Sequence, residues 1–100
     1  MMKYHDNGVL SQYTEYKNYC RDGITNFYYD NGQLEVSFLH KYDANNSPIG
    51  LRMEILSSFH KDGRAREKGT LKNGNGTWIQ YNNKGEIENV KHFTNGIENK

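Results

Sequence analysis

A short pattern that recurs four times is the feature that most constrains the fold of this chain. Each copy reads aromatic residue, three mostly polar residues, glycine, any residue, apolar residue, and the copies centre on Gly8, Gly32, Gly63 and Gly85. The glycines lie 24, 31 and 22 residues apart, which indicates a unit of about 22 to 24 residues with one insertion between the second and third copies. A chain of 100 residues has room for about one such domain.

Turn signals divide the chain into segments about one strand long. Besides the four repeat glycines, Asp-Gly or Asn-Gly pairs recur at residues 21–23, 72–76 and 94–96. These pairs supply the positive φ angles that tight hairpin turns need. We therefore expect hairpin turns at both sets of positions.

Helices are disfavoured because Gly, Asn and Asp interrupt the chain too often, and only residues 51–58 are a candidate for one. The sequence predicts an all-β fold, a single-domain antiparallel β-meander of about seven or eight strands over residues 1–100. The segment 42–53, which contains Pro48, breaks the repeat and is expected to be an inserted loop.

Alternation along the expected strands assigns side chains to two faces of the sheet. The face taken as buried carries the following residues: Leu10, Ile24, Tyr28, Leu34, Val36, Phe38, Ile55, Phe59, Ala65, Ile79, Tyr81 and Ile87. The opposite face is mixed and carries, among charged residues, Phe27, Tyr29, Leu39, Leu56, Trp78 and Val90. Because no helix covers the sheet, either the sheet curls over its own apolar side or one face is offered to another molecule.

Composition narrows the class of protein. Thirteen Lys and Arg against twelve Asp and Glu give a charge of +1, so the chain lacks the basic footprint of a dedicated nucleic-acid binder. Mean hydropathy is −1.03, and no apolar run is long enough to span a membrane. The first six residues contain no signal-peptide segment, and Cys20 has no second cysteine to pair with. We expect a cytoplasmic protein with no stable membrane insertion and no nucleic-acid partner.

Candidate catalytic and metal-binding residues are few. His5 and His60 occupy the same place in two copies, three residues before the turn glycine, where the other copies carry Tyr29 and Asn82. A position that accepts such different chemistries predicts a surface or turn role. No HExxH or paired-cysteine spacing occurs, and Cys20 has no sequence neighbour suited to activating it. The sequence therefore predicts a protein that is not an enzyme, with no catalytic residue, cofactor or metal.

The repeats resemble those of the MORN-repeat variant family. Its signature is Gly, any residue, Trp, an aromatic residue, then Asn-Gly followed by Lys or Gln and Leu. Residues 76–87 (GTWIQYNNKGEI) match it best and residues 27–35 (FYYDNGQLE) nearly as well. The first copy keeps only the second half, and the third departs most, with Ile55-Leu56 in place of Gly-Thr-Trp. These are turn and packing signatures, which specify a fold better than a function.

The resemblance implies a bacterial antitoxin or immunity protein that neutralises a cognate protein toxin by direct protein–protein binding, as a monomer or weak homodimer. The alternative is a scaffold or a membrane-lipid-associated interaction module of MORN type. Near-zero charge and the lack of a basic amphipathic helix disfavour that alternative.

The expected contact surface combines the inserted loop with outward strand positions, giving an aromatic centre and a charged rim. Eight residues are predicted to bind the partner: Tyr29, Glu35, Tyr42, Arg52, Met53, Arg64, Arg66 and Trp78. Even spacing also places four basic residues on one face of an expected strand: Arg64, Arg66, Lys68 and Lys72. This basic cluster is either a solvated face or a contact for an acidic partner or a phosphate backbone.

Overall fold

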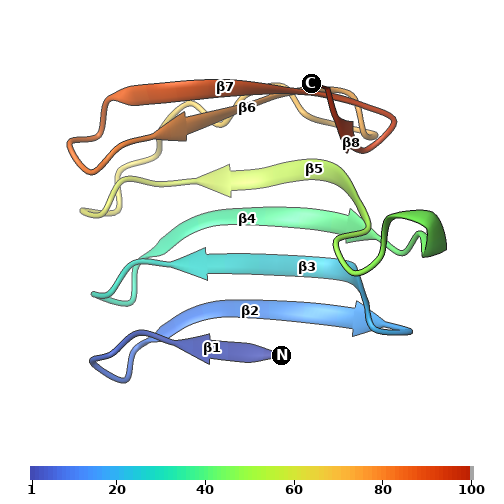
Figure 1. Cartoon of the computed structure of the whole chain (residues 1–100). Helices are drawn as coiled ribbons and strands as arrows, with labels where there is room; N and C mark the ends of the chain where they lie inside the picture. The colour runs from blue at the N-terminus through green and yellow to red at the C-terminus, as the bar shows by residue number, and fades with distance from the viewer. Residues whose placement is uncertain (100) are drawn as a thin grey trace.

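The computed structural model describes residues 1–99, and within them the fold is the predicted all-β antiparallel meander (Figure 1). Five strands form one sheet in the order β1-β2-β3-β4-β5, and three form a second sheet in the order β6-β7-β8. Their bounds are β1 (Met2–Tyr4), β2 (Leu10–Lys17), β3 (Cys20–Tyr28), β4 (Leu34–Lys41), β5 (Leu51–Ser58), β6 (Gly76–Tyr81), β7 (Ile87–Thr94) and β8 (Ile97–Glu98). A 3-10 turn, η1 (Ala44–Asn46), lies between β4 and β5, and the candidate helix at residues 51–58 is strand β5.

The four repeat glycines lie in the turns that follow β1, β3, β5 and β6. These turns lie along one edge of the molecule, at the left of Figure 1. Gly8, Gly32, Gly63 and Gly85 have φ angles of 86, 88, 91 and 78°, the conformation that the turn signals predicted. In each turn the glycine N–H donates to the carbonyl of the residue three positions earlier. The repeat pattern is therefore a turn signature, as predicted.

The turn between β2 and β3 lies elsewhere than predicted. Residues 21–23 were expected to form it, but they lie inside β3. The chain reverses instead at Asn18 and Tyr19, which have φ angles of 50 and 64°. Asn tolerates this left-handed conformation better than most residues, so an Asn without a following glycine is sufficient here.

Residues 59–75 connect the two sheets without forming a regular strand, so the prediction that the basic cluster lies on one strand face is wrong. Small and charged residues dominate this segment, and such residues are poor strand formers. Its backbone still links the sheets. The Ile55 N–H donates to the Leu71 carbonyl at 3.3 Å, and the Ile79 N–H donates to the Lys68 carbonyl at 3.1 Å.

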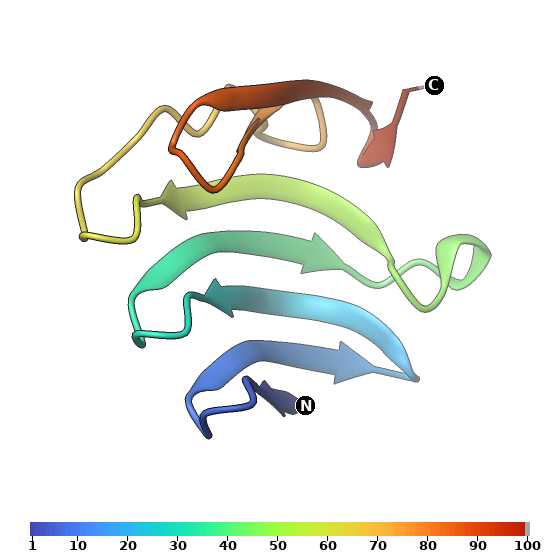
Figure 2. The same ribbon diagram turned by 60° about the vertical axis from the view of Figure 1, so that its left-hand side comes forward.

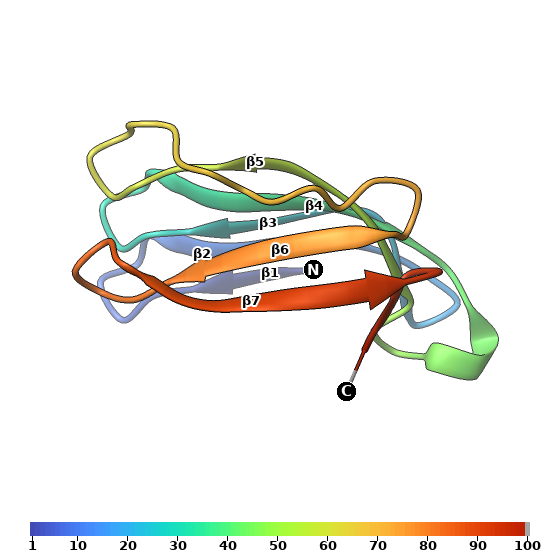
Figure 3. The same cartoon turned by 90° about the horizontal axis from the view of Figure 1, so that it is seen from above.

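The two sheets follow one another in the stack of strands, with β6 and β7 beyond β5 (Figure 1), and the stack is curved (Figures 2 and 3). The core between them comprises Val36, Phe38, Ile55, Leu71 and Phe93, with Phe27 and Trp78 packed against it. Phe38 is central. Its ring makes edge contacts with the Trp78 ring at 4.9 Å and with the Phe27 ring at 6.2 Å between centroids. The sheet thus covers its own apolar side, the first of the two alternatives.

Phe27 and Trp78 were assigned to the outer face, and that assignment is wrong. Phe27 pairs with Val36 across β3 and β4, so the two side chains share the core face. The pairing shifts register between Phe27 and Tyr28, and it shifts again at the equivalent aromatic residues of the first and fourth copies. Counting by twos across such a bulge reaches the wrong face. Two residues expected inside are exposed: Ala65 and Ile87.

The inserted loop is shorter than predicted, because residues 51–53 belong to β5. Hydrogen bonds join the loop to the neighbouring end of β3. The Arg21 N–H donates to the Pro48 carbonyl at 2.9 Å, and the Tyr42 N–H donates to the Asp22 carboxylate at 2.8 Å. The loop therefore packs against the sheet instead of standing free in solvent.

Arg52 of β5 places a charge inside the aromatic core. Its guanidinium carbon lies 4.2 Å from the ring centroid of Phe38, 5.1 Å from that of Trp78 and 5.8 Å from that of Phe93. The cation faces π-systems on β4, β6 and β7, so it contacts both sheets at once.

His40 is buried beside Arg52 and is held neutral. The Arg52 Nε–H donates to His40 Nε2 at 3.3 Å, which leaves the imidazole proton on Nδ1. Burial, followed by the positive charges of Arg52 and Arg21, lowers the pKa of His40 to about 3.

Stability should fall as the pH is lowered from 7 to 5. In the unfolded chain His40 takes up a proton near its ordinary pKa of 6.5, whereas in the folded chain it stays neutral down to about pH 3, so acid favours unfolding. The difference predicts a loss of about 2 kcal/mol in the free energy of unfolding between pH 7 and pH 5. Urea titrations of the wild type and of His40→Gln measure it, and the variant should lose about 2 kcal/mol less. Parallel pH dependences in the two proteins would contradict the buried neutral histidine.

Candidate functional site at the turn edge

Asparagine side chains join the first repeat turn to the second and the second to the third. The Asn7 Nδ2 donates to the Asp30 carbonyl at 2.8 Å, and the Asn31 Nδ2 donates to the Lys61 carbonyl at 3.0 Å. Each asparagine precedes a turn glycine, and each acceptor lies two residues before the next turn glycine. The side-chain oxygen of the same asparagine accepts the N–H of the residue after its own glycine. These bonds hold successive turns in a row.

The residue three positions before each of the first three repeat glycines makes a second line of contacts. His5 Nε2 lies 2.8 Å from the Tyr28 carbonyl oxygen, and the Tyr29 hydroxyl donates to the Phe59 carbonyl at 2.9 Å. The His60 ring packs edge-on against the aromatic ring of the fourth copy, with 5.6 Å between centroids. Each of these residues reaches the residue four positions before the next glycine. Side chains of different chemistry thus make the same link between successive turns.

Arg66 is a buried charge beside these turns, with 7% of its side chain exposed. It donates from Nη1 to the Tyr29 hydroxyl at 3.0 Å and from Nε to the Ser58 hydroxyl at 2.8 Å. Its Nη2 lies 3.6 Å from the Glu35 carboxylate, and its guanidinium carbon lies 4.3 Å from the ring centroid of Tyr81. Four partners therefore fix the orientation of one guanidinium.

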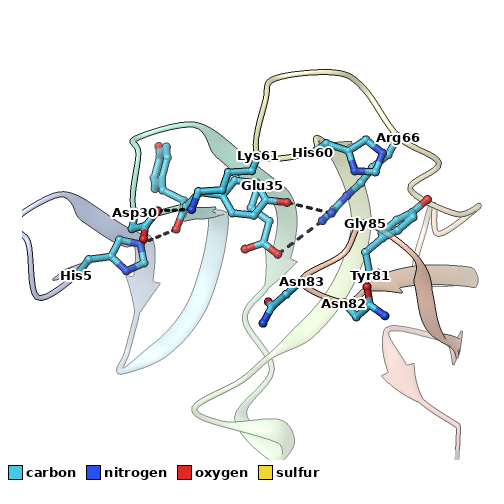
Figure 4. Close-up of a pocket in the computed structure, with 12 residues that line it drawn as sticks. His5, Asp30, Glu35, His60, Lys61, Arg66, Tyr81, Asn82, Asn83 and Gly85 are labelled. Atoms are coloured by element: carbon cyan, nitrogen blue, oxygen red, sulfur yellow. Dashed lines mark hydrogen bonds and ion pairs between the residues drawn. The ribbon is translucent and has the colours of Figure 1, made fainter.

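These contacts border a pocket of about 380 Å³, named here the turn-edge pocket (Figure 4). All four copies contribute to its lining, which comprises His5, Tyr28, Tyr29, Asp30, Glu35, His60, Lys61, Arg66, Tyr81, Asn82, Asn83 and Gly85. Asp30 and Lys61 form an exposed ion pair at 2.8 Å, and Figure 4 shows Glu35 between that pair and Arg66. The pocket is polar, and each of its carboxylates has a cation beside it.

Charge pairing and burial set the protonation of this pocket. A hydrogen bond and the positive charge of Lys61 hold the pKa of Asp30 below its ordinary value. Burial raises the pKa of Tyr29; the Glu35 charge adds to this rise, and Arg66 opposes it. At neutral pH the pocket therefore contains an ionised Asp30 and a protonated Tyr29 phenol. These groups can bind a polar ligand through hydrogen bonds and ion pairs.

Five of the predicted contact residues lie in two connected places. Tyr29, Glu35 and Arg66 meet in the turn-edge pocket. Arg52 and Trp78 meet at the aromatic core, so Trp78 lies on the core face of its strand and not on the outer face that was expected. A cavity of about 230 Å³, the middle cavity, is lined by Glu35 and Arg66 together with Arg52 and Trp78.

The other three predicted contact residues lie apart from this pocket. Tyr42 is in the loop after β4, where the Lys17 Nζ lies 5.9 Å from its ring centroid. Met53 lies half-buried within β5. Arg64 is exposed and pairs with Asp62 at 2.7 Å in its own turn.

A third hollow continues the row toward the β7–β8 turn. This hollow, named here the Arg52 recess, has a volume of about 470 Å³ and shares Arg52, Trp78 and Gln80 with the middle cavity. The middle cavity in turn shares Glu35, Arg66 and Tyr81 with the turn-edge pocket. The turn-edge pocket, the middle cavity and the Arg52 recess together form what we name the groove. It crosses from the five-stranded sheet to the three-stranded sheet.

Sequence reasoning missed His5, Lys61 and Asn83 as lining residues of the turn-edge pocket. The signal was their place in the repeat, two or three residues before a turn glycine. Because the copies stack in order, equivalent positions lie side by side and form a row. The equivalence of His5 and His60 was used to discount them as ligands, although it also predicts where they meet other side chains.

Within residues 1–99, no group of three or more His, Cys, Asp or Glu side chains converges to hold a metal ion. The same part of the chain contains no helix that is long and apolar enough to cross a membrane. Comparison with protein-family models, with curated proteins and with solved structures gives no match. The fold and the site define an all-β hairpin meander with a groove that is polar at the turn edge.

Replacing Asn31 by Asp should lower the free energy of unfolding by about 1 kcal/mol. The carboxylate keeps the oxygen that accepts the Gln33 N–H, but it loses the donor to the Lys61 carbonyl and places two acceptors against each other. Urea titration measures the change. The control is Asp62→Asn at the same position of the third copy, where the carboxylate bonds only within its own turn. We expect the control to change stability by less than about 0.5 kcal/mol. Equal losses would contradict the bonding between turns.

Proposed function

We propose that the protein is an antitoxin or immunity protein of MORN-repeat variant type, which binds and neutralises a cognate toxin in the cytoplasm. The observation that supports a binding role is the groove, because five of the eight predicted contact residues line it. The toxin as partner is supported by the resemblance of the repeats to that family.

The chemistry of the groove suits a segment of another protein. Arg66 and Tyr81 stand at the turn edge, and Arg52 and Trp78 stand further along. Arg, Tyr and Trp are the residue types that most often dominate binding energy at protein interfaces. Their side chains are already held in place here, so little conformational entropy is lost on binding.

The lipid-binding alternative has less support from the arrangement of charge. Lys61 lies beside Asp30 and Arg66 beside Glu35, so the cations of the turn-edge pocket are compensated. Anionic membranes attract clusters of uncompensated Lys and Arg. The formal charge of the whole chain is +1, which gives no general attraction to such a surface.

Co-expression with the product of the neighbouring reading frame tests the proposed function. That product should arrest growth of a bacterial host, and the wild-type protein should restore growth. Lys61→Glu reverses a charge in the turn-edge pocket and should weaken toxin affinity at least about tenfold, or 1.4 kcal/mol, in calorimetric titration.

The matched control is Lys72→Glu, because Lys72 is exposed and lies outside the lining of the groove. It should leave affinity and protection unchanged, with both variants melting at the temperature of the wild type. A neighbouring product that does not bind the protein would contradict toxin neutralisation. Equal losses in the two variants would move the contact away from the groove.

A further inference from the structure

The Arg52 recess contains a cation that forms no direct ion pair within residues 1–99. Its lining comes from β5, β6, β7, β8 and the loop after η1, and it includes Arg52, Trp78, Lys91, Phe93 and Ile97. The ion pairs found among residues 1–99 do not include Arg52. Its Nε–H bonds to His40, whereas the two Nη groups make no hydrogen bond with another residue of that range.

Neither Nη group is completely buried. Buried side-chain nitrogen and oxygen atoms that lack a hydrogen-bond partner are confined, within residues 1–99, to Thr25 Oγ1 and His40 Nδ1. The Nη atoms of Arg52 are therefore not sealed in the core. Aromatic rings cover the guanidinium, while its outer donors remain available at the recess. A planar guanidinium with two free donors matches the two oxygens of a carboxylate.

The remaining charges of the recess favour an anion. Lys91 is the second cation, with its Nζ 5.9 Å from the Trp78 ring centroid, and it pairs with Glu98 at 3.3 Å. Arg52 and Lys91 against Glu98 leave the lining residues with one net positive charge. Burial, followed by the nearby charge of Arg21, lowers the pKa of Arg52 to about 10 against the opposing effect of the Glu98 carboxylate, so the guanidinium is still protonated at neutral pH.

Two exposed apolar residues indicate that the anion belongs to a macromolecule. Ile49 and Ile97 both line the recess, and they are 57% and 49% exposed. A free small acid would leave both side chains in water. A protein segment with apolar residues beside its acidic residue would cover them while its carboxylate reached Arg52.

We propose that the Arg52 recess binds an Asp or Glu side chain of the partner protein, with neighbouring apolar residues of that partner covering Ile49 and Ile97. This inference deepens the proposed function by giving the chemistry of the partner segment. It rests on the proposed function only for the identity of the partner protein.

The test uses blocked peptides as probes, because the partner sequence is unidentified. Acetyl-Leu-Asp-Leu-amide is titrated into the wild-type protein while the Arg52 Nε–Hε and Trp78 indole N–H signals are followed by NMR. Acetyl-Leu-Asn-Leu-amide is the uncharged match, and sodium acetate represents a free small acid. Both signals should move saturably with the Asp peptide, at least about fivefold more tightly than with the Asn peptide or acetate.

A variant pair adds a second readout. Lys91→Gln removes the other cation of the recess and should weaken binding of the Asp peptide at least about threefold. Lys84→Gln, which is exposed and outside the recess, should not change it. The peptide titration uses the wild-type protein, so it remains valid even if a substitution affects folding.

Three outcomes would overturn the proposal: equal affinity for the Asp and Asn peptides, shifts that leave the Arg52 signal unmoved, or acetate binding as tightly as the peptide. The peptide titration involves no toxin, so its failure is distinguishable from failure of toxin neutralisation. Protection by the wild type together with no peptide binding would reject the recess and keep the proposed function.

Discussion

One guanidinium held among three aromatic rings joins the two sheets of this protein. Arg52 on β5 faces Phe38 on β4, Trp78 on β6 and Phe93 on β7. A meander of hairpins forms a single layer, which cannot bury an apolar face unless it bends back on itself. Cation–π contacts of about 1 to 2 kcal/mol each, together with burial of the rings, favour that bend. Because Arg52 is charged, the same contact that closes the core also leaves donors at the groove.

The turn edge follows a different physical rule from the core. Its contacts repeat with the sequence, since the first three turns are joined by hydrogen bonds from residues at fixed distances from a glycine, and the third contacts the fourth through the His60 and Tyr81 rings. These positions accept different side chains, because a hydrogen bond or a ring contact can make the link. The turn edge can therefore present a row of different chemical groups, from His5 through Asp30 to Lys61, without altering the backbone. The turn-edge pocket is a consequence of this arrangement.

The strand architecture was predictable because its turns are local. An Asn-Gly or Asp-Gly pair favours a hairpin turn through the backbone preferences of two residues, independently of the rest of the chain. The face assignment was less predictable. A bulge at Tyr28 cancels the alternation that placed Phe27 outside. The same bulge recurs at the equivalent tyrosine of the first and fourth copies, but strict alternation takes no account of it. The turn at Asn18 and Tyr19 was not predicted because it contains no glycine. The basic cluster was misread because its even spacing resembles a strand, although its segment crosses between the sheets.

The candidate site was predicted in part, for the same reasons. Tyr29, Glu35 and Arg66 were chosen as outward residues, and they do meet, because repeat stacking brings their elements to one edge. Arg52 was chosen as an interface-type residue of the inserted loop and Trp78 as an outward strand residue. Their contact depends on the curl of the sheet, which no local pattern shows. Tyr42 and Met53 were chosen with the loop, whose attachment to β3 depends on distant backbone groups.

Nuclear Overhauser contacts between the Trp78 indole and the Phe38 ring test the curl of the two sheets most directly. With 4.9 Å between the ring centroids, strong cross-peaks should join these side chains in isotope-labelled protein, and the Arg52 side-chain protons should be shifted upfield by the rings around them. A folded protein that shows the β3–β4 and β4–β5 strand contacts but no contact between Trp78 and Phe38 would contradict the closed core.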